Sequence, residues 1–335
     1  MKKEAMFYKK MKDNKVQCKL CPQFCVIGDG EWGKCRVREN ESGKLYTRSY
    51  EEPASSNVDH IEKKPLYHFL PGTNSYSIGM MGCNLGCSFC QNWALSQSRA
   101  GERFSLRTPA KNIVKKAKKY KCPSISYTYS EPLVSYEYVS EIAREARKQG
   151  IKNIIVSNGF INPEPLKKIS RYIDGANIDL KSISDNFYKN ICKARLKPVQ
   201  ESLRILKKNK VWIEITNLLI PGHNDSKKEI TKLVLWIKKN LGTRVPLHFT
   251  AFYPTYKFLH IPSTKIDKLI EARNIALKNG LKYVYTGNLP HNEGNITYCS
   301  KCKKALIVRS GFKMIKDKSK KGKCSCGEKI AGVWD

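Results

Sequence analysis

The cysteines of this chain constrain its fold more than any other feature, because most of them occur in tight groups. The chain has 13 Cys in 335 residues. Its start, MKKEAMFYKKMKDNK, lacks the apolar core of a signal peptide, so we expect a cytoplasmic protein whose cysteines bind metal. Cys122 and Cys192 stand alone and are expected to be small buried residues. The groups are Cys18, Cys21, Cys25 and Cys35; Cys83, Cys87 and Cys90; and Cys299, Cys302, Cys324 and Cys326.

The middle group has the spacing CxxxCxxC and follows an expected β-strand directly. Three thiolates are one too few for a closed tetrahedral zinc site. In a 4Fe-4S cluster they leave one iron without a protein ligand. An open iron beside a pocket can bind a small molecule, so we expect Cys83, Cys87 and Cys90 to hold a 4Fe-4S cluster at a site of chemistry.

The N-terminal group supplies four thiolates with the spacing C-x2-C-x3-C-x9-C. Four are enough for a closed zinc site or for a fully ligated second cluster. The spacing does not distinguish the two, although zinc is the more common occupant of such knuckles.

The C-terminal group consists of two pairs, C-x2-C and C-x-C, separated by a Lys-rich segment. Two paired knuckles of this kind are typical of a zinc ribbon. We therefore expect zinc at Cys299, Cys302, Cys324 and Cys326.

Between the outer groups, short apolar segments alternate with amphipathic stretches of helical length. This pattern favours an α/β fold with strand-helix units around a parallel sheet. The units are too few for a closed barrel, so we expect a partial (βα)6-type TIM barrel, with a doubly wound sheet as the alternative. Ser226 and Thr264 are expected to be helix N-caps. The expected strands are Tyr76–Met81, Ser124–Tyr129, Asn153–Val156, Ala176–Leu180, Val211–Ile220, Leu247–Phe252 and Tyr283–Tyr285.

These patterns predict that the chain has three parts. We expect residues 1–72 to form an N-terminal metal-binding segment, 73–290 the partial barrel and 291–335 a zinc-ribbon-like module. In folds of this kind the ligand site lies in the loops after the carboxyl ends of the strands.

The CxxxCxxC loop, with Phe89 before its last cysteine, resembles the radical S-adenosylmethionine (SAM) superfamily. The resemblance implies that the open iron chelates SAM, that an electron from the cluster cleaves its C–S bond, and that the resulting 5'-deoxyadenosyl radical abstracts hydrogen from a substrate. A protein reductant is then required. No residue is assigned to the hydrogen-abstraction step.

Four later loops carry the residues that this resemblance assigns to cofactor binding. Ser130 and Glu131 resemble the motif that contacts the amino group of SAM, although a carboxylate there also suits the start of the next helix. The other loops resemble those of activases of glycyl radical enzymes, but Asp179 could instead form a simple salt bridge and His248 could be a core histidine. The full set is Ser130, Glu131, Ser157, Asn158, Asp179, Lys181 and His248.

Longer blocks make the resemblance closer. The segments Cys18–Pro22, Ile61–Gly72, Cys87–Trp93, Pro221–Ser226 and Ile330–Trp334 resemble the radical SAM member of the AmmeMemoRadiSam system, a relative of pyruvate formate-lyase-activating enzyme. This family implies Memo-like and AMMECR-like partners. It leaves open whether the substrate is a protein residue or a small molecule.

The charge of the chain supports a first rival interpretation. The chain has 62 Lys+Arg against 29 Asp+Glu, a net charge of +33, and could attract RNA as a radical enzyme that modifies it. The basic residues are spread along the chain, however, and no RNA-binding motif is visible. The second rival is a non-catalytic multi-zinc interaction module.

No apolar run approaches the roughly 18 residues of a membrane helix, so no membrane association is expected.

Overall fold

The computed structural model describes residues 1–102, 106–290 and 293–335. Its centre is an eight-stranded sheet in the order β14-β13-β12-β11-β10-β9-β8-β7. Only β7 among these strands runs antiparallel to its neighbour. The strands are β7 (Ser55–His60), β8 (Asn74–Gly79), β9 (Ser124–Thr128), β10 (Lys152–Ser157), β11 (Gly175–Asp179), β12 (Trp212–Leu219), β13 (Leu247–Ala251) and β14 (Val284–Gly287).

From β8 to β14 the spatial order equals the chain order, and each strand is parallel to the one before it. A sheet wound in one direction curls into an open barrel, whereas a doubly wound sheet reverses its order at a switch point. The partial barrel is therefore confirmed. All seven expected strands are present, each within a few residues of its expected bounds.

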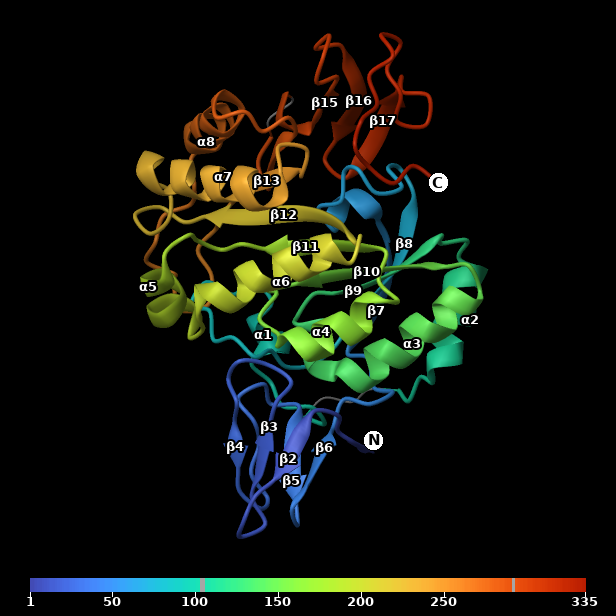
Figure 1. Ribbon diagram of the computed structural model, residues 1–335, viewed down its shortest axis with the longest axis vertical. Helices are drawn as coiled ribbons and strands as arrows, with labels where there is room; N and C mark the ends of the chain where they lie inside the picture. Colours follow the sequence, from blue (N-terminus) through green and yellow to red (C-terminus); the bar gives the residue numbers. More distant parts are fainter. Residues whose placement is uncertain (103–105, 291–292) are drawn as a thin grey trace.

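Helices connect the parallel strands and cover the outside of the sheet (Figure 1). In α3 the buried residues Val139, Ile142, Ala143 and Ala146 recur at helical spacing and form the face that packs on the barrel. The longer helices are α2 (Ala110–Lys119), α3 (Tyr136–Lys148), α4 (Pro163–Ser170), α6 (Leu196–Lys208), α7 (Lys227–Leu241) and α8 (Ile266–Lys278); the short ones are η1 (Ile61–Lys63), α1 (Trp93–Ser96), η2 (Pro132–Ser135), α5 (Asp185–Phe187), the π-helical turn η3 (Tyr188–Cys192) and η4 (Glu293–Asn295).

One of the two expected N-caps is confirmed. The Ser226 hydroxyl accepts a hydrogen bond from Glu229 N at the start of α7. Thr264 is not a cap, because α8 begins at Ile266 and the Thr264 hydroxyl instead donates to Leu219 O (2.6 Å) and accepts from Phe252 N (2.9 Å). It ties together the ends of two neighbouring strands, a tertiary role with no local signal.

Small sheets carry the outer cysteine groups and lie at opposite ends of the molecule (Figure 1). The C-terminal sheet packs on Tyr283 and Tyr285 at the start of β14. No helix in the described ranges is long and apolar enough to span a membrane. The small sheets are β1 (Lys3–Glu4), β6 (Lys44–Thr47) and β5 (Arg38–Glu41); β2 (Tyr8–Lys10), β3 (Val16–Cys18) and β4 (Val26–Ile27); and β15 (Thr297–Tyr298), β16 (Ala305–Ser310) and β17 (Lys313–Asp317).

Candidate active site

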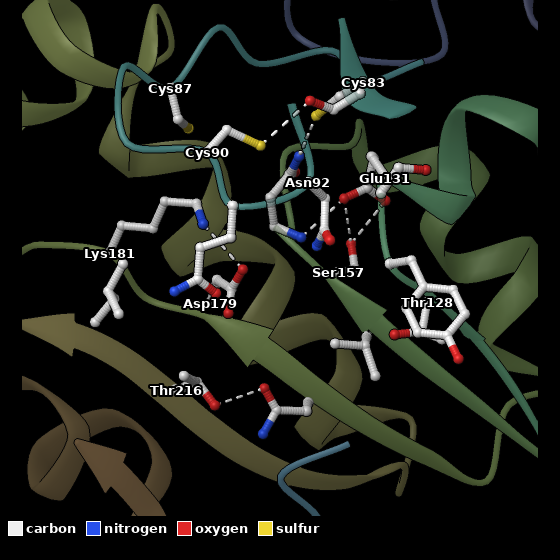
Figure 2. Close-up of a pocket in the computed structure, with 18 of the residues that line it drawn as sticks. Cys83, Cys87, Cys90, Asn92, Thr128, Glu131, Ser157, Asp179, Lys181 and Thr216 are labelled. Carbon is white, nitrogen blue, oxygen red and sulfur yellow. Dashed lines mark hydrogen bonds and ion pairs between the residues drawn. The ribbon is translucent and has the colours of Figure 1, made fainter. Parts of the chain in front are cut away.

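A cavity of about 390 Å³ lies at the carboxyl ends of the parallel strands. Loops after successive strands line it, as expected for an open barrel. Figure 2 shows the cysteine loop facing the side chains that end the strands across the cavity. The volume is in the range of small-molecule sites. The structure brings these predicted residues to the cavity: Cys83, Cys87, Cys90, Ser130, Glu131, Ser157, Asn158, Asp179 and Lys181.

The cysteine loop is held in place by backbone hydrogen bonds to the turn η3. Gly86 N donates to Cys192 O (3.0 Å), and Ser88 N donates to Ile191 O (3.1 Å). The loop enters through Gly82, whose φ of +82° suits glycine. Cys192, expected to be only a buried apolar residue, is fully buried and lies beside Cys87.

Polar groups of the cysteine loop and of two other segments lie close to the sulfurs of Cys83 and Cys90. Asn158 Nδ2 lies 3.5 Å from Cys83 Sγ, Leu85 N lies 3.4 Å from the same sulfur, and Ser96 Oγ lies 3.2 Å from Cys90 Sγ. Burial raises the pKa of Cys83, and the contact with Cys192 followed by burial raises the pKa of Cys87. Without a bound cation these thiols are protonated, whereas an iron cluster would hold them as thiolates.

The arrangement of the three cysteines fits a cluster with one open iron. All three line one cavity, and the sulfur of Cys83 accepts hydrogen bonds of the kind that surround iron-sulfur clusters. Among the described residues, three or more possible ligand atoms lie within 4.8 Å of one another only in the C-terminal cysteine group. The sulfurs of Cys83, Cys87 and Cys90 are therefore spread farther apart than around a single ion.

Glu131 caps a helix and also lines the cavity. Its carboxylate accepts from Leu133 N (3.0 Å) and so caps the short helix η2. It also lines the cavity and accepts from Ser157 Oγ (2.9 Å) and Asn158 N (2.8 Å). Burial raises the pKa of Glu131 to about 7. Ser157 and Asn158 therefore orient this carboxylate at the cavity wall, a contact that the sequence pattern did not reveal.

Asp179 and Lys181 form an ion pair across the end of β11, with 2.9 Å between Oδ2 and Nζ. Lys181 also lies over the Phe89 ring, 5.6 Å from its centroid. Burial alone would lower the pKa of Lys181, but Asp179 and the nearby thiols raise it well above its ordinary value. The salt bridge considered for Asp179 is thus present, and it stands inside the cavity beside the cysteine loop (Figure 2).

His248 does not reach the cavity. It is buried on β13, and its Nε2 lies 2.7 Å from Glu214 Oε2. The Tyr67 ring packs edge-on against it at 4.8 Å. Glu214 also accepts from the backbone of residues 67 and 68. The structure therefore gives His248 the alternative role of a hydrogen-bonded core histidine, and we no longer assign it to cofactor binding.

A buried network behind Tyr129 was missed by sequence reasoning. Lys64, Tyr129 and Asp59 come together there, with 2.6 Å between Lys64 Nζ and Asp59 Oδ2. Lys64 and Tyr129 line the cavity, and Tyr129 adopts a φ of +71°, uncommon for an aromatic residue. The block Ile61–Gly72 was noted as a resemblance, but nothing local linked Lys64 and Asp59 to Tyr129, which is distant from both in sequence.

The two outer cysteine groups differ in geometry. In the C-terminal group the sulfurs of Cys299 and Cys326 are 3.6 Å apart, as are those of Cys302 and Cys324. Four sulfurs about 2.3 Å from one zinc ion would be about 3.8 Å apart, so this group matches a single-ion site. The N-terminal group instead lines a small hollow of its own.

This chain belongs to the radical SAM superfamily, whose family model matches residues 77–234. It is 45% identical over 331 residues to the uncharacterized protein MJ0808 of Methanocaldococcus jannaschii, which covers 98% of each chain. The match to MJ0808 places both proteins in one full-length family.

More distant relatives agree with this assignment. The chain is 25% identical to the pyruvate formate-lyase-activating enzyme of Clostridium pasteurianum over 163 residues, 47% of this chain and 66% of that one. Its fold is similar to that of a radical SAM methyltransferase from Sphaerobacter thermophilus, with a TM-score of 0.52, 15% identity and coverage of 66% of this chain and 68% of that one. The chain is therefore a radical SAM enzyme with homology to activating enzymes.

Proposed function

We propose that this protein reductively cleaves SAM at a 4Fe-4S cluster ligated by Cys83, Cys87 and Cys90. When bound, the cluster supplies one electron, and the SAM sulfonium gives methionine and a 5'-deoxyadenosyl radical that abstracts hydrogen from a substrate. The observation that carries the proposal is the placement of three cysteines and a buried carboxylate around one cavity.

The chain's own residues have distinct tasks in this proposal. Glu131, oriented by Ser157 and by the backbone of Asn158, accepts hydrogen bonds from the amino group of SAM. Asn158 donates to Cys83 Sγ and stabilises its thiolate. Lys181, paired with Asp179, places a cation beside the cysteine loop.

The substrate class and partners are proposed from resemblance. The likeness to activating enzymes supports a protein residue or a small molecule as the hydrogen donor. Membership of the AmmeMemoRadiSam system, with Memo-like and AMMECR-like partners, is proposed on the sequence blocks described above. A low-potential protein reductant is required for the electron.

The product of cleavage tests the proposal. We expect the anaerobically reconstituted and reduced protein to form 5'-deoxyadenosine and methionine from SAM. Cys87→Ala should abolish the product, because it removes a cluster ligand, whereas the buried Cys122→Ala should retain it. Product formation that survives Cys87→Ala would refute the proposal.

A further inference from the structure

The N-terminal cysteine group has a geometry suited to a multinuclear centre. Cys18, Cys21, Cys25 and Cys35 line one hollow, together with apolar side chains such as Leu20 and Ile27. This hollow has a volume of about 20 Å³. The hollow is therefore larger than a single water molecule, whereas protein cores are otherwise close-packed.

The distances between the cysteine sulfurs distinguish an iron-sulfur cluster from a single zinc ion. The four C-terminal sulfurs lie within 4.8 Å of one another, but within the described ranges no three of the N-terminal sulfurs do. A cubane cluster places each thiolate on a different iron and holds the sulfurs farther apart than a single ion does. In this respect the N-terminal group is like Cys83, Cys87 and Cys90 and unlike the C-terminal group.

The charge around the hollow also suits a bound anion-rich centre. Arg38 is almost fully buried, and its Nη1 lies 3.9 Å from Cys18 Sγ. A second guanidinium nitrogen is paired with Glu137 at 2.6 Å. Four thiolates around a metal centre carry net negative charge, and the Arg38 guanidinium, although paired with Glu137, lies with its Nη1 toward one of them.

The N-terminal hollow adjoins the catalytic loop directly. Gln23, between two of the cysteines, donates its Nε2 hydrogen to Asn84 O at 2.9 Å, and Asn84 follows Cys83 in the chain. Asn84 also lines the N-terminal hollow. A Cβ on Gly82 would lie 2.3 Å from Cys35 O, so the two cysteine loops touch.

We propose that Cys18, Cys21, Cys25 and Cys35 hold a second 4Fe-4S cluster, next to the cluster that cleaves SAM. All four irons would have thiolate ligands, so this cluster has no open position for SAM or substrate. Its chemistry is confined to holding one electron, and its place beside Gly82–Asn84 suits exchange with the catalytic site. The C-terminal group, at the opposite end of the molecule, has the geometry of a single-ion site instead.

A variant without the catalytic cysteines isolates this centre. We expect Cys83→Ser/Cys87→Ser/Cys90→Ser, reconstituted without oxygen, to retain about four irons and four sulfides per chain. Reduced by dithionite, it should give an electron paramagnetic resonance (EPR) signal that SAM does not change. Zinc in place of iron in this variant, with about two zinc ions per chain, would overturn the inference.

A variant that lacks two of the N-terminal cysteines gives a second, independent test. Cys21→Ser/Cys25→Ser should lose about half of the iron of the wild type and keep a signal that SAM alters, while Cys122→Ser keeps the full iron content. An iron content equal to that of Cys122→Ser would contradict the proposal. Failure of SAM cleavage in the wild type would refute the proposed function but leave the iron of the triple variant as a separate result.

Discussion

At the scale of the residue, Glu131 links helix capping to the chemistry of the site. Its buried carboxyl has a pKa of about 7. Below that pH it is protonated and loses its charge-assisted acceptor role, so SAM affinity should be full above pH 7 and decline as the pH falls through it. Calorimetric titration of the reconstituted protein with SAM between pH 6 and 8 measures this directly.

Glu131→Gln should weaken SAM binding by about 10- to 100-fold, since a hydrogen bond to a charged group contributes about 1.5–3 kcal/mol. The pH dependence should disappear with the carboxyl. The exposed Glu164→Gln serves as the control. Unchanged affinity in Glu131→Gln would show that the carboxylate serves only as a helix cap.

At the scale of the element, a buried ion pair fixes the N-terminal sheets to α3. Arg38 and Glu137 are 2.6 Å apart, and Glu137 also accepts from Met6 N at 2.7 Å. Glu137→Ala leaves Arg38 buried without its partner and should lower the free energy of unfolding by about 3–5 kcal/mol. Denaturant unfolding under anaerobic conditions measures it.

The exposed pair of Glu164 and Lys168 provides the matched comparison for that experiment. Glu164→Ala should change the free energy of unfolding by about 0.5 kcal/mol or less, because water screens exposed pairs. Equal effects of the two substitutions would mean that the buried pair does not hold the N-terminal sheets in place.

We propose that a zinc ion bound by the four C-terminal cysteines stabilises the C-terminal sheet. Its knuckles are closed by Lys303 N to Cys299 O (3.1 Å) and by Gly327 N to Cys324 O (2.9 Å), with Gly327 at a φ of +88°. Cys302→Ser should remove about one zinc per chain and leave the iron content unchanged. Elemental analysis decides this, and loss of iron in place of zinc would contradict it.

At the scale of the whole molecule, the net charge of +33 includes lysines on solvated helix faces. In α2 every lysine is exposed, while its buried residues are apolar. We therefore expect RNA to leave the rate of 5'-deoxyadenosine formation unchanged. A stimulation by RNA that falls steeply with salt would instead favour the rival in which the enzyme modifies RNA.

The sequence predicted whatever depends on local pattern. Alternating apolar segments located all seven parallel strands, and cysteine spacing located the loop that faces the cavity. Contacts between distant segments were not predictable in this way. Thr264, His248 and the contact of Tyr129 with Asp59 depend on neighbours far away in the chain, which no local spacing encodes.

The proposed reaction depends on the binding of SAM to an open iron of the cluster at Cys83, Cys87 and Cys90. EPR of the dithionite-reduced protein, with and without saturating SAM, tests it most directly. We predict that SAM alters the signal of one cluster in the wild type and in Cys21→Ser/Cys25→Ser. A spectrum that saturating SAM leaves unchanged in both proteins would contradict the claim.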